Sequence, residues 1–185
     1  MTDESEYRYR GRYVSLIERD GWEFASRGNP LVVVLIAWTA DDELLLVEQY
    51  RKPVDRVAIE LPAGLVGDLQ DHRDESLFDA AHRELIEETG YSAGRLEEFM
   101  RCPTSAGLTD ETAVFLNACD LTQSGEGGGD DSEDITVHAI ARERIDDWLW
   151  QQYRQGKAVD PKIYSALYWS RLSPPYSPPF RREGP

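Results

Sequence analysis

The sequence predicts a single α/β domain in which a mixed β-sheet is covered by a small number of helices. Eight consecutive apolar residues at 31–38 are typical of a strand that is buried on both faces. Residues 75–89 place apolar side chains at helical spacing, and Gly90 follows at the position where a helix commonly ends. Strand patterns outnumber helix patterns along the 185 residues, a length that suits one domain.

An exposed N-terminal β-extension is expected before the main domain. Two short runs at 9–18 and 22–26 alternate apolar and charged residues, and Asp20-Gly21 between them favours a tight hairpin turn. The end of the chain is rich in proline and is expected to be extended. The expected division is an extension at 1–28, a main domain at 29–172 and a proline-rich tail at 173–185.

The main domain is expected to begin with a second hairpin. The strand at 31–38 would pair with 43–51 across a turn at Asp41-Asp42. Residues 64–74 are expected to form a loop, and the polar, glycine-rich stretch 123–134 a mobile loop. The remaining strands are predicted at 57–61, 95–101, 112–120 and 135–141, and the remaining helices at 143–155 and 161–171.

The charge of the chain limits its partners. A formal net charge of −15 argues against a general nucleic-acid binder and against a protein that binds anionic membranes. A polyphosphate substrate would be repelled by such a surface, so a site for one would need local positive charge from Mg²⁺ and a few arginines. Two cysteines suggest no disulfide framework, and neither a signal peptide nor a long apolar run is visible, so a cytoplasmic protein is expected.

The most informative segment lies near the end of the helix predicted at 75–89. Glu84, Glu87 and Glu88 are spaced so that a helix places them on neighbouring ridges of one face. Carboxylates crowded in this way repel one another unless a cation lies among them, and hard oxygen ligands favour Mg²⁺ or Mn²⁺. Arg83 can hold a carboxylate with its planar guanidinium. The alternative is a solvated acidic face.

The spacing from Glu75 through Arg83 to Gly90 resembles the Nudix box. The segment ELPAG at 60–64 is similar to the strand end that precedes this box in the ADP-ribose pyrophosphatase branch of the Nudix family. Three further matches keep the expected order, namely EQYRKP at 48–53, GLTDET at 107–112 and VDPKIYSAL at 159–167. The resemblance covers roughly residues 20–172. It implies a Nudix α/β/α sandwich with a mixed β-sheet and an N-terminal β-hairpin extension, and a homodimer, because members of this branch exchange N-terminal strands.

Two positions depart from the family pattern. Leu69 stands where the box normally opens with glycine, whereas Gly64 matches that glycine in context, so residues 65–74 are expected to be a lengthened loop. Such insertions cost little when they lie at the surface. Ala106 replaces the proline that is usual in enzymes acting on ADP-ribose, which leaves other nucleoside diphosphate sugars open.

The resemblance also implies a set of metal and catalytic residues. One to three Mg²⁺ ions, for which Mn²⁺ can substitute, would be held by Glu84, Glu87, Glu88 and the Ala63 carbonyl. Arg83 and Glu87 would belong to the catalytic group. The general base is expected in the loop before 135–141, with Glu133 as first candidate. Its competitors are Asp131, Asp134 and Glu126, and the alternative is a solvated acidic linker.

The substrate-binding residues implied by the resemblance come from other segments. Arg51 and Arg27 would contact the diphosphate, although either could be a surface arginine. Trp22 would stack on the base, and its alternative is a core or interface position. Glu60 would hydrogen-bond the substrate or orient an arginine.

The function implied is Mg²⁺-dependent hydrolysis of the pyrophosphate bond of a nucleoside diphosphate sugar. ADP-ribose is the first candidate, and its products would be AMP and ribose 5-phosphate. Two alternatives remain: a housecleaning pyrophosphatase for nucleoside triphosphates, and a non-catalytic sensor of nucleotide sugars. No nucleic acid or membrane partner is expected.

Overall fold

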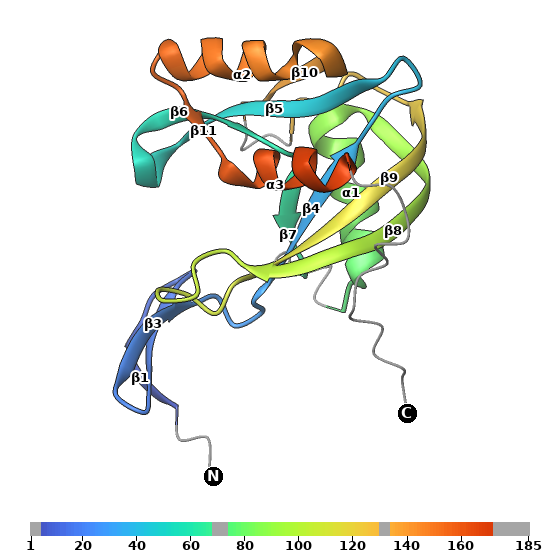
Figure 1. The fold of residues 1–185 in the computed structure, drawn as a ribbon. Helices are drawn as coiled ribbons and strands as arrows, with labels where there is room; N and C mark the ends of the chain where they lie inside the picture. The colour runs from blue at the N-terminus through green and yellow to red at the C-terminus, as the bar shows by residue number, and fades with distance from the viewer. Residues whose placement is uncertain (1–4, 68–73, 130–133, 172–185) are drawn as a thin grey trace.

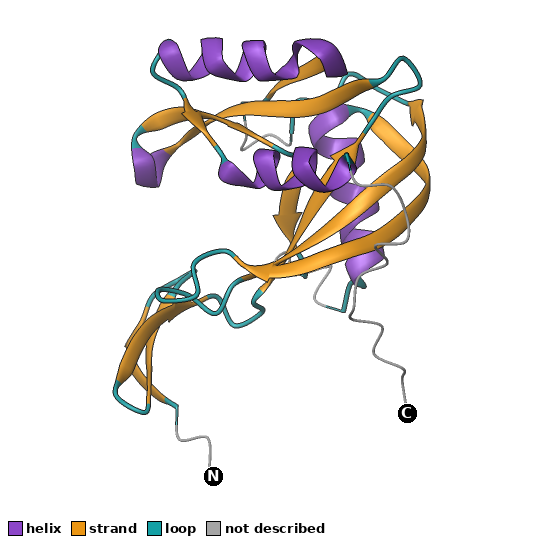
Figure 2. Ribbon diagram, viewed as in Figure 1, coloured by secondary structure: helices purple, strands orange, loops and turns teal. Residues whose placement is uncertain are grey.

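The computed structural model describes residues 5–67, 74–129 and 134–171, and it confirms an α/β fold with mixed sheets (Figures 1 and 2). Its strands form one three-stranded and two four-stranded sheets, with helices packed around them. The expected proline-rich tail at 173–185 lies outside the described residues.

The N-terminal extension is a three-stranded antiparallel sheet that projects from the body of the molecule (Figure 1). Its strands are β1 (Glu6–Arg10), β2 (Ser15–Arg19) and β3 (Trp22–Ser26). Asp20 and Gly21 both have positive φ, at 52° and 79°, and form the predicted tight turn between β2 and β3. The single strand predicted at 9–18 is wrong, because the chain reverses where Gly11 N donates to Val14 O at 3.0 Å.

The sheet that supports the candidate site has the order β7-β4-β9-β8. It contains β4 (Leu31–Ala37), β7 (Ala63–Leu65), β8 (Tyr91–Pro103) and β9 (Thr112–Gln123). Strand β4 pairs antiparallel with β7 and parallel with β9. Val33 and Leu35 face one core while Val34 and Ile36 face the other, which explains why the strand is continuously apolar.

The second four-stranded sheet has the order β10-β5-β6-β11. It contains β5 (Glu43–Arg51), β6 (Arg56–Glu60), β10 (Thr136–Ala141) and β11 (Ala158–Val159), and the short 3-10 helix η1 (Lys52–Val54) joins β5 to β6. The predicted hairpin between 31–38 and 43–51 is wrong. Only an isolated bridge between Trp38 and Leu44 connects them, because β5 finds its partners in β6 and β10 and the chain passes from one sheet to the other.

The helices form two layers on either side of the strands. Helix α1 (Leu77–Thr89) contributes to the core that contains Val33 and Leu35. Helices α2 (Ile145–Arg154), which follows the 3-10 helix η3 (Arg142–Arg144), and α3 (Pro161–Ser170) contribute to the core that contains Val34 and Ile36. The predicted helices are confirmed within two residues at each end. None of the helices in the described part of the chain has the length and apolarity that a membrane crossing needs.

The two ends of α1 follow from local sequence. Ser76 is the N-cap, and its side chain accepts a hydrogen bond from Asp79 N at 3.2 Å. Gly90 is the C-cap with φ of 74°, and its N–H donates to Ile86 O at 2.9 Å. These caps set the position of the glutamates that lie between them.

Candidate active site

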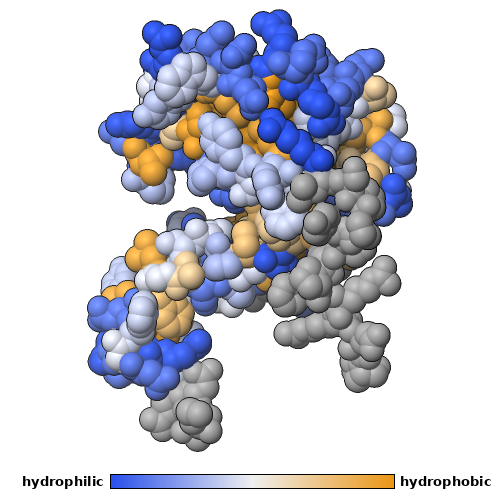
Figure 3. Space-filling model, viewed as in Figure 1, coloured by the Kyte–Doolittle hydropathy of each residue, from blue (hydrophilic) through white to orange (hydrophobic). Residues whose placement is uncertain are grey.

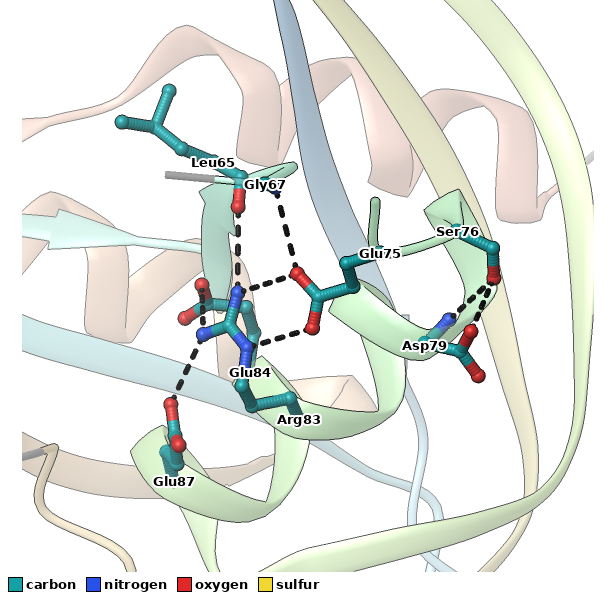
Figure 4. A network of polar contacts seen from close by, with 8 residues as sticks. All are labelled: Leu65, Gly67, Glu75, Ser76, Asp79, Arg83, Glu84 and Glu87. Atoms are coloured by element: carbon teal, nitrogen blue, oxygen red, sulfur yellow. Dashed lines mark hydrogen bonds and ion pairs between the residues drawn. The ribbon is translucent and has the colours of Figure 1, made fainter. Parts of the chain in front are cut away.

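Arg83 is the centre of a hydrogen-bonded network on α1 (Figure 4). Its Nε donates to Glu75 Oε1 at 2.9 Å and its Nη2 to Glu75 Oε2 at 3.1 Å. Its Nη1 donates to Glu84 Oε1 at 2.8 Å and to Glu87 Oε2 at 3.1 Å. The hydrogen bond to Glu75 and the charge of Glu84 raise the pKa of Arg83 despite its partial burial, so the guanidinium stays positive.

Glu75 is a functional candidate beyond the site residues predicted from the sequence. It immediately precedes the N-cap Ser76, and its side chain is only 5% exposed. Its two-point contact with Arg83 is the geometry in which a planar guanidinium binds a carboxylate most strongly. Glu75 therefore holds the arginine that in turn contacts Glu84 and Glu87. The fixed spacing between Glu75 and Arg83 in the family motif was the signal available for this pairing.

Glu84 and Glu88 point from α1 toward the backbone of β7. Glu88 is 2% exposed, and its Oε2 accepts a hydrogen bond from Ala63 N at 3.0 Å. A Cβ atom added to Gly64 would lie less than 3.0 Å from the carboxyl carbon and both oxygens of Glu84. The strand can therefore lie against this carboxylate only because position 64 has no side chain.

The chemistry of this group fits a divalent cation. Three glutamates share one guanidinium, and the buried Glu88 lies on the same part of the helix, so negative charge exceeds positive charge. Burying ionised carboxylates is costly unless cations compensate them, and hard oxygen donors suit Mg²⁺ or Mn²⁺. Within the described ranges, no three acidic, histidine or cysteine side chains form a group that could hold a metal ion as they stand, and the carboxylates instead accept hydrogen bonds from Arg83 and Ala63 N.

Arg51 and Glu60 lie on the same side of the strands as α1. Arg51 Nε donates to Glu60 Oε2 at 2.8 Å, and Gln49 Nε2 donates to the same oxygen at 3.3 Å. Alternate residues of β5, among them Leu45, Val47 and Gln49, lie on one face of the strand, and Glu60 is the cross-strand partner of Val47 on that face. Leu45 belongs to the core that α1 covers, so this face is the one toward α1. Ala63 lies three positions after Glu60, a span of about 11 Å at most. The fold thus places this arginine near the carboxylate network.

Trp22 and Arg27 meet a different segment, the loop that precedes β9. Trp22 Nε1 donates to Gly107 O at 3.4 Å, and its side chain is 63% exposed, so it is not a core residue of this chain. Arg27 Nε lies 3.9 Å from Glu111 Oε2. Ala25 N donates to Leu108 O at 2.8 Å, which attaches β3 to this loop. The structure therefore groups Trp22 and Arg27 with the GLTDE segment.

The candidate general bases are only partly placed. Glu133 and Asp131 lie outside the described residues. Asp134 and Glu126 are described and exposed. The described part of the loop expected at 123–134 is not a freely solvated linker, because the backbone N–H groups of residues 124, 125, 128 and 129 donate to carbonyls at the C-terminal end of α1.

The fold and this carboxylate helix define a member of the Nudix family. Residues 28–162 match the model of the NUDIX domain, so the chain belongs to that family. It is a pyrophosphohydrolase by class, and Nudix hydrolases generally use divalent metal ions and act on substrates such as nucleotide sugars.

Named relatives place the chain near one branch of this family. It is 30% identical over 176 residues to an ADP-ribose pyrophosphatase of Escherichia coli (strain K12), covering 90% of this chain and 79% of that one. It is 32% identical over 178 residues to a methanol dehydrogenase activator of Bacillus methanolicus, covering 92% of each. A crystal structure of an ADP compounds hydrolase has the same fold, with a TM-score of 0.69, 22% identity and coverage of 91% and 90%. The chain is a Nudix hydrolase related to the ADP-ribose pyrophosphatases.

Proposed function

We propose that this protein hydrolyses the pyrophosphate bond of a nucleoside diphosphate sugar in a Mg²⁺-dependent reaction, with ADP-ribose as the first candidate substrate. The products would be AMP and ribose 5-phosphate. The observation that carries the proposal is the packing of Glu84 and Glu88 between α1 and the backbone of β7, next to the network held by Arg83. The similarity to ADP-ribose pyrophosphatases supports this choice of substrate.

Glu84, Glu87, Glu88 and the Ala63 carbonyl are the proposed ligands of the cation. When bound, Mg²⁺ supplies positive charge that offsets the pyrophosphate and makes water more acidic. Arg83 restrains Glu84 and Glu87, and Glu75 restrains Arg83. Metal sites in proteins typically have such hydrogen bonds, which orient the side chains that bind the metal.

The remaining groups bind substrate and accept the proton. Arg51, held by Glu60 and Gln49, is proposed to contact the diphosphate, with Arg27 as a second contact. Trp22 offers an exposed ring on which a base can stack, which tolerates different bases. In the reaction, the oxygen of water bonds to one phosphorus, the bond from that phosphorus to the bridging oxygen breaks, and Glu133 takes the proton from water.

The proposed assembly is a homodimer formed through the extension at 1–28, without nucleic acid or membrane partners. Exposed aromatic residues on its strands support this assembly, among them Tyr7 at 45% and Tyr9 at 66% exposure. Figure 3 shows hydrophobic as well as hydrophilic residues on the surface of this extension. Sedimentation velocity of the full chain tests the dimer, and a concentration-independent monomer would reject it.

A substrate panel tests the reaction. ADP-ribose, ADP-glucose, UDP-glucose, GDP-mannose and dinucleotides are assayed with Mg²⁺ and with Mn²⁺, and the products are identified. We expect ADP-ribose to give AMP and ribose 5-phosphate and no inorganic phosphate. Faster cleavage of nucleoside triphosphates, with release of phosphate or pyrophosphate, would instead identify a triphosphate pyrophosphatase.

A second candidate function follows from one relative. The similarity to a methanol dehydrogenase activator, which covers 92% of each chain, favours a role in which this hydrolase activates a dehydrogenase. Purified methanol dehydrogenase is assayed with this protein and Mg²⁺, using the Glu88→Gln variant as control. An increase in dehydrogenase rate with the unsubstituted protein alone would support the role, and equal rates would reject it.

A further inference from the structure

The glycine-rich segment before β10 folds back on the C-terminal end of α1. Gly128 N donates to Glu88 O at 2.9 Å, and Gly129 N donates to Glu87 O at 2.9 Å. Both acceptors are main-chain carbonyls of residues whose side chains are proposed ligands of the cation. We call residues 127–129 the glycine clamp.

The clamp supplies hydrogen bonds that the helix itself cannot make. The last four carbonyls of an α-helix have no N–H partner within the helix. Here Gly90 N satisfies Ile86 O, and the clamp satisfies the next two carbonyls, those of Glu87 and Glu88. Without such partners the last turn of a helix frays into water. The clamp therefore acts on the turn that carries two proposed ligands.

The backbone of the clamp favours glycine at all three positions, and at Gly127 a side chain would clash with α1. All three clamp residues have positive φ, at 71°, 113° and 83° for Gly127, Gly128 and Gly129. A Cβ atom on Gly127 would lie 2.6 Å from Glu88 O and 2.7 Å from Gly90 N, so the two backbones touch. The glycines at these positions are explained by a close approach between backbones as well as by chain reversal.

The clamp also ties the helix to the next strand. Ile135 N donates to Gly128 O at 3.3 Å, and Ile135 is buried just before β10. The last turn of α1 is thereby connected to the sheet that carries Arg51 and Glu60.

We propose that the glycine clamp is a positioning element for the divalent cation, holding the last turn of α1 so that Glu87 and Glu88 are set for binding. The inference rests on the proposed cation site. When the glutamates are already held in place, cation binding does not cost the conformational entropy of ordering them. Loss of the clamp therefore weakens cation binding. Because coupling between two sites is reciprocal, cation binding also stabilises the clamp.

Substitution of one clamp residue tests this inference in the full-length protein. Gly127→Ala introduces both a strained φ and a clash with α1. Gly156→Ala is the matched control for strain alone, since Gly156 has φ of 87° and nothing within 4 Å of an added Cβ. Gly125→Ala controls for the loop, since its φ is not in the strained range and its nearest contact is Gly90 Cα at 4.0 Å.

The readout is Mn²⁺ binding without nucleotide, measured as free Mn²⁺ by electron paramagnetic resonance. We expect Gly127→Ala to weaken binding about fivefold or more, within the usual range of coupling between sites, and both controls to stay within about twofold. Equal affinity in a folded Gly127→Ala protein overturns the inference while leaving the cation site intact. Failure of the unsubstituted protein to bind Mn²⁺ overturns the cation site itself.

Amide hydrogen exchange in the unsubstituted protein gives a second test that does not depend on folding of a variant. Saturating Mg²⁺ should slow exchange of the Gly128 and Gly129 amides about fivefold or more, by the reciprocity of coupling. The Gly156 amide, which donates to Tyr153 O at 2.9 Å at the end of α2, should be unaffected. Exchange at the clamp that does not respond to Mg²⁺ overturns the inference.

Discussion

Glu75 binds Arg83 through two hydrogen bonds, of 2.9 and 3.1 Å, in a position where 5% of the Glu75 side chain and 14% of the Arg83 side chain are exposed. This pair links the residue before the N-cap of α1 to the middle of the helix. Arg83 then reaches Glu84 and Glu87, so one buried ion pair positions two proposed ligands.

Replacing Glu75 tests how much this ion pair contributes to the stability of the fold. Glu75→Gln should lower the free energy of unfolding by about 1–3 kcal/mol, because one charged partner of a buried guanidinium is lost. Urea denaturation measures the change. The control is Glu98→Gln, which removes a more exposed partner of Arg101 and should cost less than about 1 kcal/mol. Equal losses in the two variants would contradict a special role for Glu75.

A methyl group at position 64 should disturb the carboxylate of Glu84. Gly64→Ala places Cβ within 3.0 Å of that carboxyl group, so either the side chain or β7 must shift. We expect turnover at fixed Mg²⁺ to fall about tenfold or more, as expected when a metal ligand loses its support. Gly156→Ala, whose added Cβ meets nothing within 4 Å, should retain turnover. Full activity of Gly64→Ala would show that Glu84 can move without consequence.

Removal of the Glu88 charge tests the cation site directly. Glu88→Gln keeps the shape of the side chain and an oxygen for Ala63 N, but removes a proposed ligand charge. Turnover with Mg²⁺ should fall by about a hundredfold or more. Glu97→Gln, on the exposed part of β8, serves as the matched control. If Glu88→Gln retained full activity, the proposed function would be wrong.

The proton acceptor is tested at the loop before β10. Glu133→Gln should lower turnover about tenfold or more with little change in substrate binding, since general bases contribute at least about this factor. Steady-state kinetics and equilibrium binding separate the two effects. The same substitution at Glu126, and Asn at Asp131 and Asp134, tests the competitors. Unchanged turnover in Glu133→Gln would reject its assignment.

A pH-dependent contribution to stability is expected from Glu48. Burial raises the pKa of its carboxyl, but hydrogen bonds from Lys157 and His138, each of 2.8 Å, outweigh burial and hold the pKa below its usual value. A carboxyl group whose pKa is lowered in the folded state stabilises the fold at pH values above its ordinary pKa. This stabilisation is lost as the pH falls through the folded-state pKa.

The variant Lys157→Met removes one of these partners and keeps most of the side-chain stem. Urea denaturation should show a loss of about 1 kcal/mol at pH 7. The difference from the unsubstituted protein should shrink below about pH 4, where carboxyl groups become protonated. A loss that is the same at pH 3 and pH 7 would mean that the Glu48 charge is not involved.

Elements whose signals are local could be predicted from the residues alone. The helix predicted at 75–89 and observed at 77–89, its end at Gly90 and the spacing of its glutamates depend on residues within a few positions of one another. The same holds for the turn at Asp20-Gly21, where two positive φ angles suit a two-residue hairpin loop. Periodicity and turn chemistry report such features because they act over one or two turns of chain.

Contacts between distant segments could not be predicted from local patterns. Strands β4 and β5 are both apolar and adjacent in sequence, yet they belong to different sheets, and no local pattern distinguishes a hairpin from a crossing between sheets. The contact of Gly64 with Glu84, and of the glycine clamp with the end of α1, joins residues that lie 20 or more positions apart. Their composition allowed close approach, but the partner was fixed by packing of the whole chain, because hydrogen bonds and excluded volume between such segments exist only once the core has formed.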